Sequence, residues 1–459
     1  MLKHHFSQAY NRWRNSNNKK KNFNRRSSMF GIGNRFSKTA IGRKLKNLLQ
    51  MDLNFHTEPS TNGLHAFHAF AAKFPPQLPR LFIRGLTESG ETILDPMCGS
   101  GTTLVEATLA NRHAVGVDID PLAYLQTLVK TTPLDPVAAA GAVKHVGERA
   151  ENLLVCGAIS EADLEKRFDD ETRRFIDYWF LKKTQFELVA LLQSIETETR
   201  NDDLRRFLQV VFSSIIVTKS GGVSMARDLA HSRPHLDKSK EPRNSIKAFL
   251  AKGIRSAEAM KALSGVRAPV DVIKGDARKL PLQNDSVHLI VTSPPYANAI
   301  DYPRAHKFSL VWLGNGISEM TRLRSEYIGT EKIRPAPAGL PSSIEDILSQ
   351  IGERDKRREQ IIRQYFFDMF QILREMARVL VPGRAAILVI GPSTVRGIKI
   401  NTPECIAVLG EHTGLEVVSI RKRELDRNRR MLPVSRVTNE NGIELRVHEE
   451  SVIGFLKPR

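Results

Sequence analysis

The sequence predicts an α/β protein in which a mostly parallel sheet is interrupted by a helical insertion. Three observations lead to this prediction. Residues 91–123 alternate between short apolar strands, a glycine loop and an amphipathic helix, and two further apolar strands begin at residue 270. The residues between these two blocks show the spacing of amphipathic helices. With 459 residues, 41% of them hydrophobic, the chain can bury a sizeable core in two or three lobes.

The composition predicts a soluble protein of a reducing compartment, which we expect to be the cytoplasm. Cys98, Cys156 and Cys405 form no CxxC pair and are too few for a disulfide framework. No stretch approaches the ~18 consecutive apolar residues of a membrane span. The first residues also lack the charged-then-apolar order of a secretory signal.

Residues 1–50 carry an uneven share of the positive charge. They contain 13 of the 69 Lys and Arg residues and no Asp or Glu, whereas the other 56 basic residues nearly balance the 50 acidic ones. Asn, Ser, Lys and Arg follow one another with little periodicity, which predicts a disordered tail. Such a tail would contact nucleic-acid phosphates without sequence preference. A solvated tail, a transit peptide, or a leader ahead of a start at Met29 or Met51 fits the same residues.

The first block of strands predicts a nucleoside-binding site. The expected elements are a strand over 92–94, a helix over 103–110 and a strand over 114–117. Gly99 and Gly101 let the chain turn tightly into the helix, whose free N–H groups suit polar ligand atoms. Asp118 follows the second strand, where a carboxylate can accept both hydroxyls of a ribose. Taken alone, the loop fits a structural turn as well as a nucleotide site.

The same loop argues against some nucleotides. It lacks the GKS or GKT ending of a phosphate loop and the three spaced glycines of a dinucleotide site, which disfavours ATP and NAD. A nucleoside without a polyphosphate remains, and S-adenosylmethionine fits this description. A third strand over 270–274 ends in GDAR and places Asp276 where it can meet an adenine edge.

The next strand ends in VTSPPY, residues 291–296. Proline cannot sit in the middle of a sheet because it lacks an N–H, so the two prolines must lie beyond the carboxyl end of the strand. Open α/β sheets hold their ligands at that edge. The glycine loop and VTSPPY are therefore expected to face one site.

Together these motifs resemble the amino-methyltransferase family, S-adenosylmethionine enzymes that methylate exocyclic amines of DNA bases. The resemblance rests on DPMCGSGTTLVEA, VGVDIDP, GDAR and TSPPY in this order, and it covers roughly residues 64–125 and 271–457. It implies a Rossmann-like class I methyltransferase fold, with a seven-stranded, mostly parallel sheet whose last strand is antiparallel. A leading serine in SPPY is typical of cytosine-N4 enzymes, whereas adenine enzymes more often carry aspartate there.

The resemblance also implies which residues bind the cofactor, S-adenosylmethionine. The segment HAFHAFAAKFPPQLPRLFI resembles the helix of that family that closes over the methionine end of the cofactor. The cofactor-binding residues expected from these motifs are Lys73, Phe74, Asp95, Pro96, Cys98, Gly99, Gly101, Thr102, Asp118 and Asp276.

The SPPY motif suits methyl transfer to an exocyclic amine, whose lone pair is delocalised into the ring. If Ser293 and the carbonyl of Pro294 each accept one N–H, the nitrogen becomes more tetrahedral and its lone pair points at the methyl group. Pro294 and Pro295 would hold this geometry through their fixed φ angles. Tyr296 would stack on the base, which must be flipped out of a duplex or already be single-stranded. We expect neither a covalent enzyme intermediate nor a metal ion.

Four reactive side chains have plainer interpretations. Cys98 lies in the glycine loop and not in the loop that supplies the nucleophile of carbon-5 cytosine methyltransferases, so we expect it to pack. His65, His68 and His306 show no metal-binding spacing such as HExxH, so we expect ordinary polar contacts.

Residues 131–265 are predicted to form a helical lobe. The apolar residues of RRFIDYWFLKKTQFELVALLQSI and of LRRFLQVVFSSIIV lie on helical stripes, with Tyr178 and Trp179 expected in the core. The following loop, TKSGGVSMARDLAHSRPH, is either part of target recognition or a solvated connection. The recognition region of the family commonly follows the GDAR strand, so which lobe reads the target stays open. Nucleic-acid-binding residues are expected in this loop, in the segment after SPPY and in the later basic run RKRELDRNRRMLP. They are Lys219, Arg227, Arg233, Arg304, Arg429 and Arg430.

The chain thus divides into a tail (1–50), a first methyltransferase part (51–130), the insertion (131–265) and a second methyltransferase part (266–459). The predicted function is methylation of cytosine N4 in DNA. Adenine N6 is the near alternative, a tRNA or rRNA guanine-N2 methyltransferase is a rival, and a nucleic-acid-binding protein without catalysis is another. The expected partner is DNA, with RNA as the alternative and no membrane. The sequence does not specify a cognate restriction endonuclease or an oligomeric state.

Overall fold

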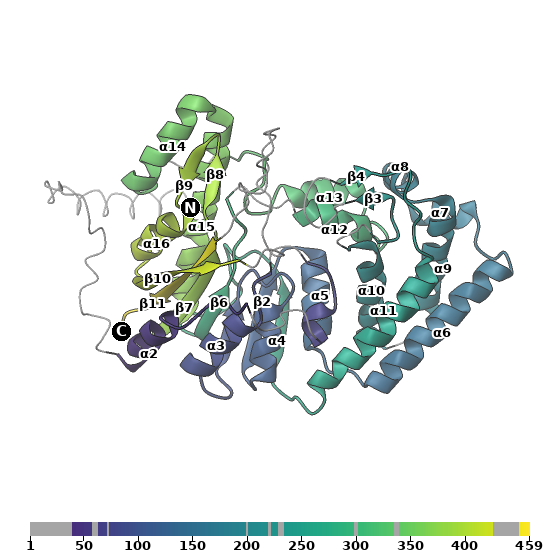
Figure 1. Ribbon diagram of the computed structural model, residues 1–459, viewed down its shortest axis with the longest axis horizontal. Helices are drawn as coiled ribbons and strands as arrows, with labels where there is room; N and C mark the ends of the chain where they lie inside the picture. Colours follow the sequence, from purple (N-terminus) through teal and green to yellow (C-terminus); the bar gives the residue numbers. More distant parts are fainter. Residues whose placement is uncertain are drawn as a thin grey trace, which may run out of the picture.

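A computed structural model describes nine stretches of the chain, and the account below concerns these residues. They are 39–56, 63–70, 73–198, 201–218, 222–227, 234–297, 302–334, 339–425 and 449–459. Within them, seven strands form one sheet in the order β10-β11-β7-β6-β1-β2-β5, and two small hairpins stand apart from it (Figure 1). The sheet strands are β1 (Thr92–Asp95), β2 (His113–Asp118), β5 (Val270–Lys274), β6 (Val287–Thr292), β7 (Leu380–Ile390), β10 (Glu416–Glu424) and β11 (Glu449–Leu456). The hairpins are β3 (Ala226–Arg227) with β4 (His235–Leu236), and β8 (Ser393–Val395) with β9 (Ile398–Ile400).

The sheet has the topology that the sequence predicts. β5, β2, β1, β6 and β7 are parallel, and β11 runs antiparallel to both β7 and β10. The strands expected over 92–94, 114–117 and 270–274 are therefore confirmed as β1, β2 and β5. Their apolar runs follow from burial on both faces, which parallel strands require. Successive residues alternate between the faces, so that Ile93 and Leu94 belong to different core clusters.

Helices cover both faces of the sheet. The short helices α2 (Ala40–Leu49), α3 (Gln77–Leu86) and α4 (Thr102–Leu109) pack on one face, and α14 (Ser342–Arg354), α15 (Lys356–Val379) and α16 (Thr402–His412) pack on the other. α5 (Pro121–Thr131) packs beside α4 and along β2 and β5. This three-layer arrangement fixes the carboxyl ends of the parallel strands at one edge of the domain.

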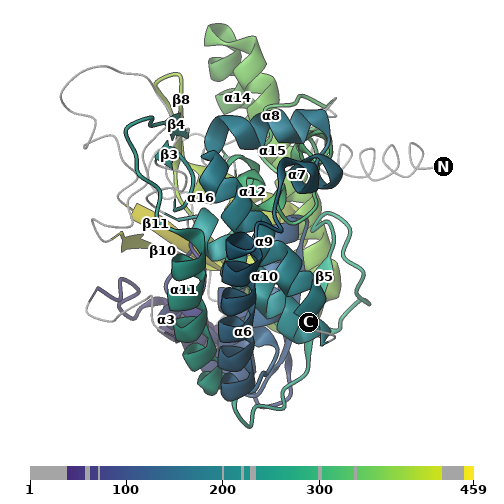
Figure 2. The ribbon, with the colours of Figure 1, turned by 90° about the vertical axis from the view of Figure 1, so that its right-hand side faces the viewer.

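A second body of helices lies to one side of the sheet (Figures 1 and 2). We call it the insertion lobe. Its helices are α6 (Pro136–Val155), α7 (Glu161–Arg167), α8 (Asp170–Trp179), α9 (Lys182–Glu198), α10 (Asp202–Ile216) and α11 (Ser245–Ala259), with the 3-10 helix η3 (Met260–Leu263) at its end and η2 (Gly63–Ala66) beside it.

The core of the insertion lobe extends beyond residue 265. α12 (Tyr302–Leu310) packs on α10, and α13 (Ile317–Arg324) packs on α8. Phe308 and Trp312 are fully buried among the apolar residues of the lobe. The residues that follow SPPY in the chain thus belong to the same hydrophobic core as the insertion.

The expectation of a disordered tail up to Gln50 is wrong for its last residues. Ala40–Leu49 forms α2, and the Thr39 side chain caps it by accepting a hydrogen bond from the N–H of Gly42 at 3.0 Å. Leu45 and Leu49 are fully buried against the sheet. Their helical spacing is enough to dock the segment despite its positive charge. Residues 1–38 lie outside the described stretches.

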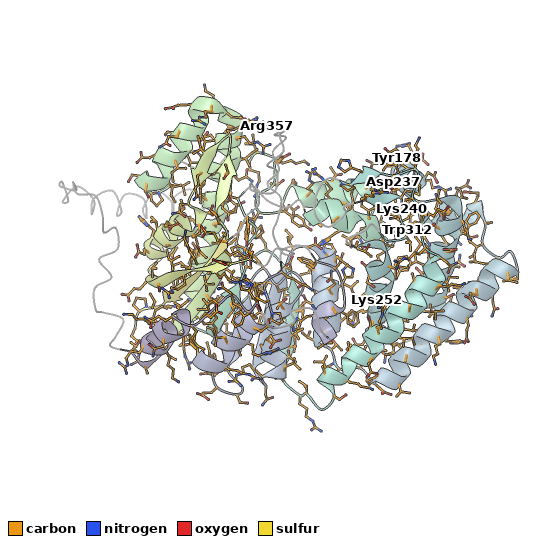
Figure 3. All side chains as sticks on the ribbon, in the orientation of Figure 1. Tyr178, Asp237, Lys240, Lys252, Trp312 and Arg357 are labelled. Atoms are coloured by element: carbon orange, nitrogen blue, oxygen red, sulfur yellow. The ribbon has the colours of Figure 1, made fainter. Side chains whose placement is uncertain are left out.

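Two expectations about the insertion lobe also need correction. The stripe predicted over RRFIDYWFLKKTQFELVALLQSI is divided between α8 and α9, because the chain leaves the helical conformation at Phe180. Tyr178 is 58% exposed instead of buried, and Figure 3 shows it at the upper edge of the lobe. Its neighbour Trp179 packs on Phe308, with ring centroids 4.9 Å apart. None of the helices in the described stretches has the length and apolar character needed to cross a membrane.

Candidate active site

A cavity opens at the carboxyl edge of the sheet and contains most of the predicted cofactor residues. It is lined by the segment before α3, the loop after β1, the ends of β2 and β5, and the loop after β6. The predicted cofactor residues that line it are Lys73, Phe74, Asp95, Pro96, Cys98, Gly99, Thr102, Asp118 and Asp276. Ser293 and Pro295 of the SPPY motif line the same cavity.

The loop after β1 turns tightly because two glycines adopt the left-handed backbone conformation, with φ of 49° at Gly99 and 74° at Gly101. The N–H of Gly99 donates to Oδ2 of Asp118 at 2.7 Å, which joins the loop to the end of β2. A Cβ on Gly101 would lie 2.7 Å from Oγ1 of Thr127. Gly101 therefore packs against α5 at the start of α4, and its contact with the cofactor stays a prediction.

Two carboxyl groups in this loop region, the half-buried Asp118 and the buried Asp95, resist ionisation. Burial raises the pKa of Asp118 to about 7, and the neighbouring charge of Asp120 adds to this effect. Burial likewise raises the pKa of Asp95 to about 6. Both oxygens of Asp118 accept backbone N–H groups, from Gly99 and, at 2.9 Å, from Asp120. These bonds fix the carboxyl group at the cavity wall, where it can accept ligand hydroxyls.

Lys73 is held at the cavity by a buried polar network. Its Nζ donates to the carbonyl of His65 at 2.5 Å, and Nε2 of His65 lies 2.8 Å from Oε1 of Glu106. Arg80 donates to Oε2 of Glu106 at 2.7 Å. Burial alone would raise the pKa of Glu106, but His65 and Arg80 hold it below its usual value. Glu106 thus remains charged and keeps the segment before α3 in place.

The predicted ordinary roles of the histidines and of Cys98 are confirmed. Nε2 of His68 lies 2.8 Å from the hydroxyl of Ser213, and Nδ1 of His306 lies 2.7 Å from Oδ2 of Asp120. Burial raises the pKa of the Cys98 thiol well above its usual value of 9.0, so the thiol stays protonated. A protonated, buried thiol is a poor nucleophile.

Asp276 lines the cavity with a partner that the sequence analysis missed. Arg278 of the GDAR motif donates to both carboxylate oxygens of Asp276, and its NH2 lies 2.7 Å from Oδ2. The same guanidinium contacts Asp368 of α15 at 3.0 Å and the carbonyl of Glu326 at 2.9 Å. Arg278 therefore fixes Asp276 and ties the cavity wall to α15. The available sequence signal was an arginine two residues after the motif aspartate.

A hydrogen-bonded cluster at the cavity rim was also missed. Oδ2 of Asp120 accepts the hydroxyl of Tyr327 at 2.7 Å in addition to its contact with His306. Burial alone would raise the pKa of Asp120, but the contacts with His306 and Tyr327 lower it. Tyr327, with its neighbours Glu326 and Ile328, lines the cavity from a segment to which no function was assigned. The only local sequence signal for this cluster was Asp120 itself, the second aspartate of VGVDIDP.

The SPPY motif follows β6 as predicted. Ser293 and Pro295 line the cavity, whereas Pro294 is buried and does not line it. The hydroxyl of Tyr365, a fully buried residue of α15, donates to the carbonyl of Pro295 at 3.0 Å. The backbone of the motif is thus anchored to the layer of helices beside the sheet.

Tyr296 does not occupy the position that base stacking would need. Its side chain is only 7% exposed and does not line the cavity. Its hydroxyl donates to Oε1 of Glu450 at 2.5 Å, and its ring lies against Gly391, where a Cβ would be 2.9 Å from the ring. In this conformation the ring faces Gly391 and not the cavity, and the stacking role of Tyr296 stays a prediction. The aromatic side chains that line the cavity are Phe70, Phe74 and Tyr327.

The predicted nucleic-acid-binding residues are only partly described. Arg227 is exposed on β3 and forms an ion pair with Asp237. Arg304 lies on α12 and is half-buried. Lys219, Arg233, Arg429 and Arg430 lie outside the described stretches. The first arginines of the later basic run donate instead to backbone carbonyls, Arg421 to that of Leu49 at the end of α2 and Arg423 to that of Leu53. Across the described stretches, no group of three or more His, Cys, Asp or Glu side chains could hold a metal ion.

Comparison with known proteins gives consistent matches. A family model described as DNA methylase matches residues 3–128. The chain is similar to the type II methyltransferase M.MvaI of Kocuria varians, with 25% identity over 430 residues that cover 88% of this chain and 92% of that protein. It is also similar to the type II methyltransferase M.BsoBI of Geobacillus stearothermophilus, with 25% identity over 302 residues that cover 58% of this chain and 56% of that protein.

Among solved structures, the chain is similar to a SAM-dependent methyltransferase from Methanosarcina mazei. The identity is 11%, the match covers 82% of this chain and 98% of that chain, and the TM-score is 0.29. The strand order and strand directions of the sheet define the fold independently of this match.

Proposed function

Because the chain belongs to the S-adenosylmethionine-dependent DNA amino-methyltransferase family, we propose that it methylates the N4 amine of cytosine in DNA. The observation that carries the proposal is that Ser293 and Pro295 line the same cavity as Gly99 and Asp118. A methyl donor bound by the glycine loop and an amine bound by SPPY would therefore face each other.

The residues of the cavity fit S-adenosylmethionine. The left-handed turn at Gly99 leaves room for close approach of a ligand, and the Asp118 carboxyl group is fixed at the end of β2 with lone pairs left for ribose hydroxyls. Asp276, held by Arg278, lies at the end of β5 and suits an adenine amine. When bound, the cofactor supplies an electrophilic methyl group on a sulfonium, so the protein has only to position the acceptor.

The chain's own contribution to catalysis is the orientation of the amine. The hydroxyl of Ser293 would accept one N–H, and the carbonyl of Pro294, a residue that lies between the two motif residues lining the cavity, would accept the other once the amine is bound, which would draw the nitrogen toward a tetrahedral geometry. Interactions that strengthen during this rehybridisation lower the barrier, because they favour the transition state over the bound substrate. Phe70 and Tyr327 are the aromatic residues placed to contact a flipped base, in place of Tyr296.

DNA binding is proposed to use the insertion lobe and the residues that follow SPPY. Arg227 and Arg304 would contact phosphates, which position a duplex without reading its sequence. Because the relatives are type II methyltransferases, we also propose that methylation protects DNA from a cognate restriction endonuclease. The leading serine of SPPY supports N4 of cytosine over N6 of adenine.

The test is to incubate the full chain with labelled S-adenosylmethionine and either DNA or tRNA. Mass spectrometry of the nucleosides from the digested DNA would then identify the modified base. N4-methylcytosine is the expected product. N6-methyladenine would move the assignment to adenine, N2-methylguanine in tRNA would move it to RNA, and label in neither substrate would contradict an amino-methyltransferase.

A further inference from the structure

Tyr296 of the SPPY motif is tied to β11, two strands away from β6 in the sheet, by a buried carboxylate. Glu450 lies on β11, and its Oε1 accepts the Tyr296 hydroxyl at 2.5 Å. The two residues are 154 positions apart in the chain, so only the fold brings them together. Gly391, at the end of β7, leaves the space that the ring fills.

The carboxylate of Glu450 is itself oriented by a buried cation. Its Oε2 accepts NH1 of Arg423 at 2.6 Å, and the side chains of Glu450 and Arg423 are 10% and 1% exposed. The two residues face each other in the register of β11 with β10. Nε of Arg423 donates to the carbonyl of Leu53 at 2.9 Å. Besides contacting each other, the guanidinium is therefore compensated by this carbonyl and the carboxylate by the Tyr296 hydroxyl.

Stability alone does not explain why a buried ion pair such as Glu450 with Arg423 is present. Removing two charges from water costs free energy, and buried ion pairs can often be replaced by apolar residues without loss of stability. The other role open to this pair is to hold the Tyr296 hydroxyl, which Glu450 accepts. An acceptor that is charged forms a shorter and stronger hydrogen bond than a neutral one, which suits a group that must not move.

The hydroxyl contact acts on the catalytic backbone directly. Tyr296 follows Pro295, whose carbonyl accepts the Tyr365 hydroxyl, so two consecutive residues of the motif are held by buried partners from β11 and α15. Between these anchors and β6 lie only Ser293 and Pro294, whose acceptor atoms must meet the two N–H groups of the amine.

We propose that Glu450, oriented by Arg423, is a positioning residue that sets the geometry of Ser293 and Pro294 through the Tyr296 hydroxyl. The inference rests on the proposed function, because it concerns the step in which the amine is methylated. It assigns to Tyr296 a role in holding the motif.

The test compares single-turnover methylation of DNA by the parental chain and by Glu450→Gln, Tyr296→Phe and the double variant. Glu450→Gln keeps the shape of the side chain but turns an amide toward either the guanidinium or the hydroxyl. Tyr296→Phe removes only the hydroxyl and keeps the packing of the ring. We expect each single variant to slow methyl transfer by about tenfold or more, since a 1 Å displacement can cost about 100-fold.

Three further measurements separate positioning from a loss of folding. S-adenosylmethionine affinity should stay at the parental value in both single variants, because neither residue lines the cavity. The double variant should be no slower than the slower single variant, since both changes break the same contact. Glu91→Gln is the matched control, because it weakens the half-buried pair of Glu91 with Arg384, where β1 begins and away from the cavity. Its rate should equal that of the parent.

Several results would overturn the proposal. A parental rate of methyl transfer in Tyr296→Phe would overturn it, whatever the rate of Glu450→Gln. If Glu450→Gln does not fold, Tyr296→Phe alone decides whether the proposal holds. Rate losses that multiply in the double variant would also overturn it, as would a lower unfolding free energy with an unchanged rate. If the parental chain methylates no nucleic acid, it is the proposed function that fails.

Discussion

At the scale of single residues, Asp118 links cofactor binding to pH. Its carboxyl group has a pKa of about 7 in the cofactor-free protein because of burial and the charge of Asp120. Ribose hydroxyls donate to the ionised form, so S-adenosylmethionine affinity should rise as the pH increases through 7. The expected gain is up to about tenfold per pH unit below the pKa. Calorimetry between pH 6 and 8 would measure it, and Asp118→Asn should remove the dependence on pH.

The same shift has a defined consequence for stability. A raised pKa means that the folded protein binds more protons at Asp118 than the unfolded chain does between pH 3.8 and about 7. The contribution of Asp118 to the free energy of unfolding is therefore present at low pH and falls as the pH rises through this window. A flat cofactor affinity from pH 6 to 8 would contradict both statements.

Ser293 is expected to act mainly on the chemical step. Ser293→Ala removes one acceptor of the amine, worth about 0.5–1.5 kcal/mol, which corresponds to roughly a twofold to twelvefold slower single turnover. Cofactor affinity should change little, because the hydroxyl is proposed to face the base. Rapid-quench measurement with labelled cofactor would test this, and a parental rate would remove Ser293 from the mechanism.

Cys98 serves as the control at the same scale. Its thiol lines the cavity but is protonated, because burial raises its pKa well above 9.0. Cys98→Ser should therefore keep the single-turnover rate within about threefold of the parental value, as for a packing residue. A complete loss of activity with an intact fold would point to a covalent mechanism.

The sequence predicted the residues of the site that lie within one motif, such as Asp118 and Ser293, because local spacing places them at strand ends. It could not predict partners that the fold brings from a distance. Asp120 meets His306 and Tyr327 from 186 and 207 residues away, and no local pattern marks such pairs. The position of Tyr296 was missed for the same reason, because the hydroxyl partner that keeps the ring out of the cavity lies on another strand.

At the scale of elements, two roles of the basic residues 1–50 can be tested separately. Residues 1–38 would contact phosphates, whereas α2 packs on the sheet. A chain that begins at residue 39 lacks ten of the Lys and Arg residues but keeps α2. If residues 1–38 contact phosphates, this deletion should flatten the dependence of DNA affinity on salt while its unfolding free energy stays at the parental value. Equal slopes of log affinity against log salt would leave no phosphate role for these residues.

A chain that begins at residue 51 should instead lose stability. It lacks Leu45 and Leu49, which are fully buried and contact Gly454 of β11. Two buried leucines correspond to about 3–6 kcal/mol of unfolding free energy. Denaturant unfolding would measure the difference, and an unchanged midpoint would show that α2 adds nothing to the fold. The sequence did not reveal this helix because its apolar stripe is short and lies among basic residues.

At the scale of the whole molecule, Phe308, from the part of the chain that follows SPPY, completes the core of the insertion lobe. It is fully buried, and its ring centroid lies 5.1 Å from that of Phe175 and 4.9 Å from that of Trp179. Phe308→Ala should lower the unfolding free energy by about 3–5 kcal/mol. Tyr178→Ala, on the exposed side of the same lobe, should change it by less than about 0.5 kcal/mol. Equal effects in denaturant unfolding would refute the shared core.

The pattern of strand, loop and helix predicted the parallel strands around the glycine loop, and the resemblance carried by the order of motifs implied the complete seven-stranded sheet. The order of motifs could not predict how the insertion lobe packs against the residues that follow SPPY. The helical stripes of the insertion identify its apolar faces, but nothing in them shows that Phe308 and Trp312, which follow SPPY, complete the core.

The place of β11 in the sheet bears on how the protein is made. This strand comes last among the seven in chain order, yet it lies between β7 and β10 and, within the described stretches, is the only strand that pairs with β10. While a ribosome is still adding residues 426–448, β10 has been synthesised but its partner β11 has not, so the edge of β7 is still open. The carboxylate that holds Tyr296 has not yet been synthesised. Methylating activity is therefore expected to appear only after translation has passed β11, however early the cofactor site folds.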